Sequence, residues 1–369
     1  MNKFTFTSEA VTEGHPDKVC DLVADSILDA HLAQDKNSRV ACEVLAKSGN
    51  LILAGEITST ARVDVERVAR ETIRNIGYTD PAEPFNADDV AITTLLTRQV
   101  AEIAGGVSRA GDDPTDQGAG DQGIMFGYAT KETPELMPLP ILLAQRVARC
   151  LAGARLRGDV RWLRPDGKTQ VSVSYEAGVP MAVTDVLVST QHDPGIEQSE
   201  IAEFVRTVLL PQALGSWSHD GIRTLVNPSG SFVEGGPSAD AGVTGRKIIV
   251  DTYGGFARHG GGAFSGKDPS KVDRSGAYFC RFVARQIVKA GLCDRAELQV
   301  SYAIGRSKPI SVLVETFGTG DNERAAAFVK EHFDFRPRAI IEQLDLLRPI
   351  YASTTNYGHF GKPELAWEE

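Results

Sequence analysis

The chain has 369 residues, of which 42% are hydrophobic and 24% are charged, an ordinary globular composition with room for two or three domains. Its net charge of −10 argues against nucleic acid as the main partner and makes any local group of basic residues informative. Its five cysteines lack CxxC spacing, and neither a signal peptide nor a bilayer-spanning run is expected, so we expect a cytoplasmic protein without disulfides, zinc or membrane contact.

The first expected helix starts at Pro16, after the segment TSEAVTEGHPDK (Thr7–Lys18). Apolar residues recur behind it at helical spacing. His15 and Asp17 therefore stand at a helix start. Asp17 could be only a first-turn acid that the helix dipole stabilises, and His15 only a structural histidine. A functional role for both stays open.

A hairpin is expected next, over Val40–Thr58, because two apolar runs flank the turn residues Ser48–Asn50. Glu43 and Glu56 are carboxylates within these apolar runs, which is costly if they face inward unpaired. The alternating pattern favours both pointing to solvent. A helix that stops at Gly77 follows, and then a further helical segment that ends near Leu96.

The segment Arg98–Gly123 is rich in Gly, Asp, Pro and Thr, which is typical of a mobile loop. Such a loop is either an active-site lid or a linker. It ends in GAGDQG (Gly118–Gly123). Asp121 there suits the binding of an ammonium group, and it suits a simple turn equally well.

The middle of the chain repeats the first pattern. A helix is expected over Pro138–Arg155, a hairpin over Thr169–Thr190 and a helix over Ile201–Leu214. Between the first two lies a turn, WLRPDGK (Trp162–Lys168), whose Lys168 reaches either a phosphate or only solvent.

Leu225–Asp251 combines glycine-rich turns with KIIVD (Lys247–Asp251), which we expect to be a strand. Phe232 lies beside glycines and offers a ring face on which a base could stack. Asp240, Arg246 and Lys247 are charges in glycine-rich surroundings. A core phenylalanine and surface charges are the alternative interpretation.

Gly260–Gly276 reads GGGAFSGKDPSKVDRSG and contains a helix start, with Asp268 expected as cap and Pro269 in the first turn. Lys267 and Lys271 are unfavourable beside the positive end of a helix dipole, unless an anion such as phosphate sits there. The alternative is a solvated glycine-rich loop. GGAFSGK also matches the start of a P-loop, but Asp268 replaces the required Ser or Thr and no strand leads directly into it, so we reject a P-loop kinase.

The order helix, hairpin, helix occurs three times, with first helices that begin near Pro16, Pro138 and Arg274 and a third hairpin over Glu297–Phe317. This predicts an α+β fold of three related domains, each with a sheet covered by helices on one face. The remaining sheet faces are expected to pack on one another.

The side chains of this inventory suit a long polyanion. Basic groups that could neutralise it are His15, Lys168, Arg246, Lys247, Lys267 and Lys271. Asp17 and Asp273 could hold magnesium, which prefers oxygen ligands. No Ser-His-Asp or Cys-His set indicates a nucleophile.

Four motifs resemble those of the S-adenosylmethionine synthetase (methionine adenosyltransferase) family: GHPDK (Gly14–Lys18), GAGDQGIMFGYAT (Gly118–Thr130), GRKIIVDTYGG (Gly245–Gly255) and HGGGAFSGKDPSKVDRS (His259–Ser275). The resemblance runs from about Phe6 to Trp367. It implies three α+β domains related by a pseudo-threefold axis, expected here at 1–101, 118–232 and 233–369 with a flexible active-site loop at 102–117. It also implies homodimers with active sites between subunits, usually paired into homotetramers.

The family makes S-adenosylmethionine from ATP and L-methionine and then cleaves the tripolyphosphate. The resemblance implies that His15, Lys168, Arg246, Lys247 and Lys267 are catalytic. ATP would also border Asp166, Gly167, Ser231, Phe232, Asp240 and Ala263. Methionine would be surrounded by Glu56, Gln99, Asp121, Asp240 and Lys271. Two Mg²⁺ ions would bind to Asp17 and Asp273, and Glu43 would help to hold K⁺. The loop from Gln99 to about Arg109 would gate the site.

The chain departs from the family pattern in three places. Ser231 stands where the family usually has arginine, so one cation near the nucleotide is missing. Glu234 replaces a usual apolar residue and adds a negative charge. The gating loop reads QVAEIAGGV (Gln99–Val107) where the family commonly has QSPDIAQGV. We expect these changes to affect affinity, rate and gating rather than reaction type.

Overall fold

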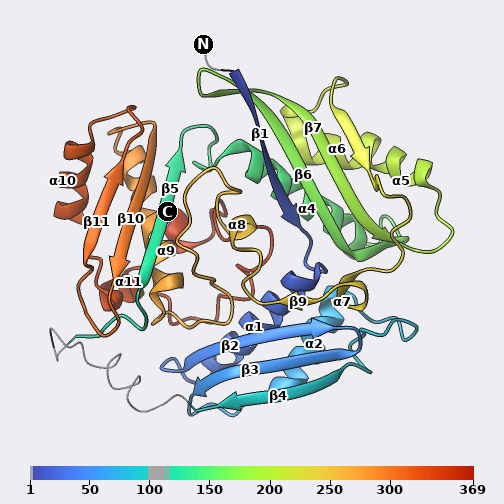
Figure 1. Cartoon of the computed structure of the whole chain (residues 1–369), viewed down its shortest axis with the longest axis horizontal. Coiled ribbons are helices and arrows are strands. Elements are labelled where there is room, and N and C mark those ends of the chain that lie inside the picture. The colour runs from blue at the N-terminus through green and yellow to red at the C-terminus, as the bar shows by residue number, and fades with distance from the viewer. Residues whose placement is uncertain (1–2, 99–112, 114–115) are drawn as a thin grey trace.

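The structure is a computed structural model that describes residues 3–98, 113 and 116–369 (Figure 1). Three β-sheets occupy separate corners of the molecule, and the segment that carries α8 lies between them. Three units of the chain share the same sequence of elements: a single strand, a long helix and a two-stranded hairpin.

The first of these units contains β1 (Lys3–Val11), α1 (Pro16–Leu32), β2 (Arg39–Lys47) and β3 (Asn50–Thr58). The second contains β5 (Gly123–Thr130), α4 (Leu139–Leu156), β6 (Leu163–Glu176) and β7 (Val179–His192). The third contains β9 (Gly242–Val243), α9 (Val272–Lys289), β10 (Arg295–Tyr302) and β11 (Ser311–Glu315). The three expected hairpins and their preceding helices are thus confirmed, as is the three-domain α+β fold.

The single strand of each unit pairs with the hairpin of another unit. β1 pairs antiparallel with β6, β5 with β10, and β9 with β2. These three exchanges form a closed cycle, since every unit gives one strand and receives one. The long helix of each unit packs on the hairpin of its own unit and on the strand that this hairpin receives from another unit. These contacts join α1 to β2 and β9, α4 to β6 and β1, and α9 to β10 and β5. The pseudo-threefold relation therefore includes the topology as well as the element order.

Two sheets carry a fourth strand in parallel pairing, with β4 (Ala91–Thr97) on β3 and β8 (Arg223–Val226) on β7. The expected helical segment that ends near Leu96 is therefore wrong. The run AITTLLT is only seven residues long and rich in β-branched residues, which suits an edge strand. α2 (Val65–Ile76) makes the crossover from β3 and stops at Gly77, as expected.

The expected strand KIIVD is also wrong, because Ile248–Asp251 forms the short helix α8. The Asp251 amide donates to the Lys247 carbonyl, so this run satisfies its backbone locally rather than in a sheet. The expected helix Ile201–Leu214 is divided into α5 (Gln198–Phe204), a π-helical turn η1 (Val205–Leu209) and α6 (Leu210–Leu214).

The remaining short elements connect or close these units. They are η2 (Gly215–Trp217), α7 (Gly236–Ala239), α10 (Asn322–His332), α11 (Pro337–Gln343) and η3 (Ala366–Glu368). None of the helices in the described part of the chain has both the length and the apolar character needed to cross a membrane.

The sheet β4–β3–β2–β9 has one face against α1 and an open second face. Leu45 and Leu95 are 39% and 59% exposed there, beside the exposed carboxylates of Glu43 and Glu56. The expectation that the second faces pack on one another within the chain is wrong for this sheet. The two carboxylates explain this, because burying them unpaired would be costly. Their expected outward direction is confirmed.

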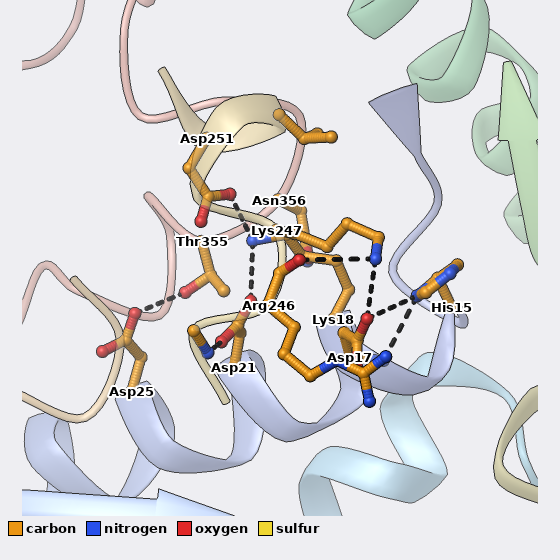
Figure 2. A network of polar contacts seen from close by, with 12 residues as sticks. His15, Asp17, Lys18, Asp21, Asp25, Arg246, Lys247, Asp251, Thr355 and Asn356 are labelled. Atoms are coloured by element: carbon orange, nitrogen blue, oxygen red, sulfur yellow. Dashed lines mark hydrogen bonds and ion pairs between the residues drawn. The ribbon is translucent and has the colours of Figure 1, made fainter. Parts of the chain in front are cut away.

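A cluster of buried charged side chains lies between α1 and α8 (Figure 2). The Lys18 ammonium binds Asp21 Oδ2 at 2.9 Å and also Asp251, and all three residues are fully or almost fully buried. Two carboxylates thus share one ammonium. Burial raises the pKa of Asp251 to about 7, against the attraction of Lys18 and together with repulsion from Asp21.

Close packing of β5 on α9 gives the first prediction. A Cβ atom on Gly127 would lie 2.0 Å from the Cys280 backbone carbon, so Gly127→Ala should lower the free energy of unfolding by about 1–3 kcal/mol or more. In Gly153→Ala the new Cβ meets only the flexible end of Arg157 at 2.9 Å. This helical control should be neutral or stabilising by up to about 1 kcal/mol. Urea unfolding measures both, and equal stability of the two variants would contradict the close approach.

The buried charge gives a second prediction. Lys18→Met leaves two buried carboxylates unpaired and should cost about 3–5 kcal/mol of unfolding free energy. Asp251→Asn leaves Lys18 paired with Asp21 and should cost far less.

The pH dependence has a definite sign. Because the pKa of Asp251 is raised in the folded state, that state binds more protons than the unfolded one between about pH 4 and 7. The contribution of Asp251 to stability therefore falls as pH rises through this window. Urea titrations at pH 5 and pH 8 should show that Asp251→Asn gains stability relative to the parent at the higher pH, and the opposite trend would disprove the assignment.

Candidate active site

His15 and Asp17 form the start of α1, as expected. His15 is the N-cap residue, and its Nδ1 accepts a hydrogen bond from the Asp17 amide at 3.2 Å. Burial lowers the pKa of His15 to about 3, and the nearby charge of Lys247 acts in the same direction. The imidazole is therefore neutral near pH 7 and can serve as a hydrogen-bonding group without carrying charge.

Asp17 connects the start of α1 to Arg246 and Lys247, which form the first of two basic segments. Its carboxylate accepts hydrogen bonds from Lys247 Nζ at 2.7 Å and from the Val243 amide at 3.0 Å, and Arg246 Nε lies 3.7 Å away (Figure 2). Burial opposes the charged form, but these bonds outweigh it and lower the pKa of Asp17. An ionised acid thus holds two cations at the start of α1.

The second basic segment contains Lys267 and Lys271, and each of these lysines is paired with an aspartate. Lys267 Nζ binds Asp273 Oδ2 at 2.8 Å. Lys271 Nζ binds Asp268 Oδ2 at 2.5 Å. α9 begins at Val272 with Lys271 as its N-cap residue and no side-chain cap, so the expected cap at Asp268 is wrong. Asp268 is instead fully buried and accepts the Val40 amide at 2.7 Å, which ties this loop to β2.

Both basic segments follow the same edge of β2. β9 pairs with Leu45 and Ala46, and the Thr244 amide donates to the Val44 carbonyl at 3.0 Å. Further along the strand, Lys267 makes an isolated bridge with Ala41. The edge therefore brings Arg246, Lys247 and Lys267 together from positions about 20 residues apart in the sequence.

The residues expected at the nucleotide lie on β6 and the neighbouring loops. One Asp166 oxygen accepts the Gly236 amide at 2.8 Å, and the other is buried without a partner within the described structure. Burial raises the pKa of Asp166 to about 6. Lys168 is exposed two residues further, after Gly167, and its charge reaches His15. This part of β6 thus lies beside the start of α1.

Phe232 is half-buried and its amide donates to His192 Nε2 at 3.0 Å. Ser231 beside it is exposed. Glu234 is exposed. Burial raises the pKa of Glu83, and the negative charge of Glu234 acts in the same direction. Ala263 is close to Gly245, since a Cβ on that glycine would lie 2.6 Å from the Ala263 Cβ.

The residues expected to bind methionine or potassium are more scattered. Asp121 is exposed and accepts the neighbouring Gln122 amide at 2.8 Å. Asp240 is exposed and accepts the Ala241 amide at 2.8 Å. Glu43 accepts the Thr244 hydroxyl. Within the described residues, no hydrogen bond or ion pair joins Glu56 or Asp121 to Arg246, Lys247 or Lys267.

Some expectations lie outside the described residues, namely Gln99 and the gating loop from Gln99 to about Arg109. Sequence reasoning also missed a second layer that includes Asp21, Asp25 and Arg274. The one available signal was the regular spacing of aspartates after Asp17 in α1. Across the described ranges 3–98 and 116–369, no group of three or more His, Cys, Asp or Glu has the geometry of a metal site.

Comparisons with known proteins show which family the chain belongs to. The chain matches family models described as the N-terminal, central and C-terminal domains of S-adenosylmethionine synthetase, over residues 3–101, 116–232 and 234–369. A protein named S-adenosylmethionine synthase from Sorangium cellulosum is 52% identical, with 100% of this chain and 88% of that protein covered. Those from Akkermansia muciniphila and Thermus thermophilus are 54% and 53% identical, covering 99% and 98% of this chain and 94% and 95% of theirs. The chain therefore belongs to the S-adenosylmethionine synthetase family.

Proposed function

We propose that this protein is a methionine adenosyltransferase, which transfers the adenosyl group of ATP to the sulfur of L-methionine. The tripolyphosphate that leaves is then hydrolysed to phosphate and diphosphate. The observation that carries this proposal is that one edge of β2 pairs with Lys267 and with β9, the strand that leads to Arg246 and Lys247, and that the charge of Lys247 acts on His15 at the start of α1. In a chain of this family, such a cationic edge suits a linear chain of phosphates.

The chemistry explains why cations are needed and a general base is not. The thioether sulfur of methionine is a neutral nucleophile with no proton to lose. It attacks C5′ of ATP, the C5′–O bond breaks, and the bonding electrons leave with the tripolyphosphate. The barrier comes from charge that grows on this leaving group, and fixed cations stabilise such charge most effectively in a preorganised site.

Each expected residue keeps its role in this proposal. His15, Lys168, Arg246, Lys247 and Lys267 act on the phosphates, with Arg246 most important for tripolyphosphate hydrolysis. The adenosine part is bordered by Asp166, Gly167, Ser231, Phe232, Asp240 and Ala263. Methionine is bound by Glu56, Gln99, Asp121, Asp240 and Lys271. A buried oxygen of Asp166 has no hydrogen-bond partner among the described residues, which supports the role of Asp166 beside adenosine because a buried acceptor needs a donor.

The acids of the site fit Mg²⁺ as a cofactor. Asp17 and Asp273 are separate carboxylates, each held here by a lysine ammonium. Mg²⁺ is usually bound through one or two carboxylates together with substrate phosphates and water, so one acid per ion suits two ions. Bound Mg²⁺ would neutralise charge on the departing phosphates. Glu43, with the Thr244 hydroxyl beside it, offers oxygen atoms for K⁺.

The open sheet face supports a homodimer with active sites between subunits. Leu45 and Leu95 are exposed on that face of the single chain, where Glu56 also lies. A second copy packed there would cover the apolar side chains. It could also bring the residues that bind the substrate L-methionine, such as Glu56, close to Arg246, Lys247 and Lys267 of its partner. We propose pairing of such dimers into a homotetramer, a cytoplasmic location, and units at 1–101, 118–232 and 233–369 with a gating loop at 102–117.

A product assay tests the reaction. The purified protein is incubated with ATP, L-methionine, Mg²⁺ and K⁺, and the products are identified by mass. We expect a sulfonium product together with phosphate and diphosphate. ADP with a phosphorylated acceptor would instead indicate a kinase, and unchanged substrates would indicate a non-catalytic paralogue, which Ser231 and Glu234 make worth testing.

Lys267→Ala tests the role of the cations directly. It should slow sulfonium formation by at least about a hundredfold, because a charge contact in the transition state is lost. Lys131→Ala is a matched control, since Lys131 also forms an ion pair, at 2.7 Å to Asp294 compared with 2.8 Å for Lys267 and Asp273. Its rate should stay unchanged. An unimpaired Lys267→Ala enzyme would remove this residue from the mechanism.

A further inference from the structure

Four aspartates recur every fourth residue along one face of α1: Asp17, Asp21, Asp25 and Asp29. Each accepts backbone amides of a loop from the C-terminal third of the chain. The amide donors are Val243 for Asp17, Gly245 for Asp21, Gly266 for Asp25, and Tyr351 and Ala352 for Asp29. The helix thus presents a row of acceptors to these loops, and Figure 2 shows three of them, Asp17, Asp21 and Asp25.

Two of these amides stand immediately before basic residues of the site. Asp21 Oδ1 accepts the Gly245 amide at 2.9 Å, and Arg246 and Lys247 follow. Asp25 Oδ1 accepts the Gly266 amide at 2.9 Å, and Lys267 follows. Gly245 and Gly266 have φ values of +73° and +78°, so each is a left-handed turn that directs the next side chain.

The two acceptors are themselves fixed. Asp21 Oδ2 binds the buried Lys18 ammonium at 2.9 Å. Asp25 binds both Nη atoms of Arg274, at 2.6 and 2.8 Å, and the Thr355 hydroxyl at 2.7 Å. Both carboxylates are 0% exposed. A carboxylate with bonds to both oxygens in a buried site cannot shift without losing one of them.

We propose that Asp21 and Asp25 are positioning residues, which set the separation of the Arg246–Lys247 turn and the Lys267 turn to fit the tripolyphosphate chain. Side chains four residues apart on a helix have Cβ atoms about 5–6 Å apart, so one turn of α1 determines how far apart the two turns are held. This proposal rests on the function proposed above. Neither aspartate touches the substrate.

Isosteric variants test it. In Asp21→Asn, the single amide oxygen cannot serve both Lys18 and Gly245, which bind different carboxylate oxygens. In Asp25→Asn, an oxygen in the Oδ1 position still accepts from Gly266 and Arg274, but the NH₂ group in the Oδ2 position faces Arg274 Nη2 and loses the bond from the Thr355 hydroxyl. Asp29→Asn is the matched control, because Asp29 accepts two loop amides at 2.9 and 2.8 Å but its loop carries none of the cations of the site. The full-length enzyme is titrated with inorganic tripolyphosphate and Mg²⁺ by calorimetry, and KM values for ATP and methionine are measured.

We expect Asp21→Asn and Asp25→Asn to weaken tripolyphosphate binding and raise the KM for ATP by on the order of tenfold or more, with the KM for methionine unchanged. Asp29→Asn should leave all three values unchanged. A merely structural loss would lower kcat through the folded fraction while Kd and KM stayed constant. If Asp25→Asn does not fold, Asp21→Asn alone decides the comparison.

Two results would overturn the positioning role: parent-like tripolyphosphate affinity in Asp21→Asn, or equal weakening in Asp29→Asn, which would show a general loosening of α1. The proposed function fails in a different way. A parent protein that binds tripolyphosphate but forms no sulfonium product loses the proposed reaction, while the comparison of variants still decides the positioning role. A parent protein that binds no tripolyphosphate overturns both.

Discussion

The placement of Arg246, Lys247 and Lys267 depends on how one edge of β2 is completed. A strand edge carries amide and carbonyl groups that need partners. On β2 these partners come from two separate segments of the C-terminal third, because β9 pairs with Leu45 and Ala46 while Lys267 bridges to Ala41. The sheet needs these segments whether or not a ligand is present. The cations are therefore brought together by folding, and the site does not have to be assembled by its substrate.

Gathering like charges on one strand edge is unfavourable unless acids offset them. Asp17 holds Lys247 and lies 3.7 Å from Arg246, and Asp273 holds Lys267. These acids are the two that we propose as Mg²⁺ ligands. Without nucleotide they act as counter-ions for the cations. In the proposed function, phosphate oxygens of the nucleotide would replace them on the lysines, which would free the carboxylates for metal ions. The site can thus keep its local charge balanced in both states.

Much of the fold could be predicted from the sequence, because periodicity and turn residues are local signals. The hairpins and the helices at Pro16 and Pro138 follow from such signals. The errors arose where tertiary contacts decide. Asp268 has the chemistry of a cap, but it binds the Val40 amide of a distant strand, so α9 starts at Val272 with Lys271 in the cap position. The strand exchange could not be predicted either, since β9 has only two residues and no pattern of its own.

The candidate site shows the same division between local and distant information. From the residues alone, the roles of His15, Asp17 and Lys247 stayed open and only Lys267 and Lys271 favoured an anion, so the resemblance to the family supplied the expected roles. Asp21 looked like an ordinary polar residue on an amphipathic helix. Its partner Gly245 is 224 residues away, and nothing near Asp21 indicates that pairing. The sequence alone therefore predicts which groups act on an anion. The structure adds the contacts that hold these groups in place. Aspartates on successive turns of α1 accept backbone amides from loops in the C-terminal third of the chain.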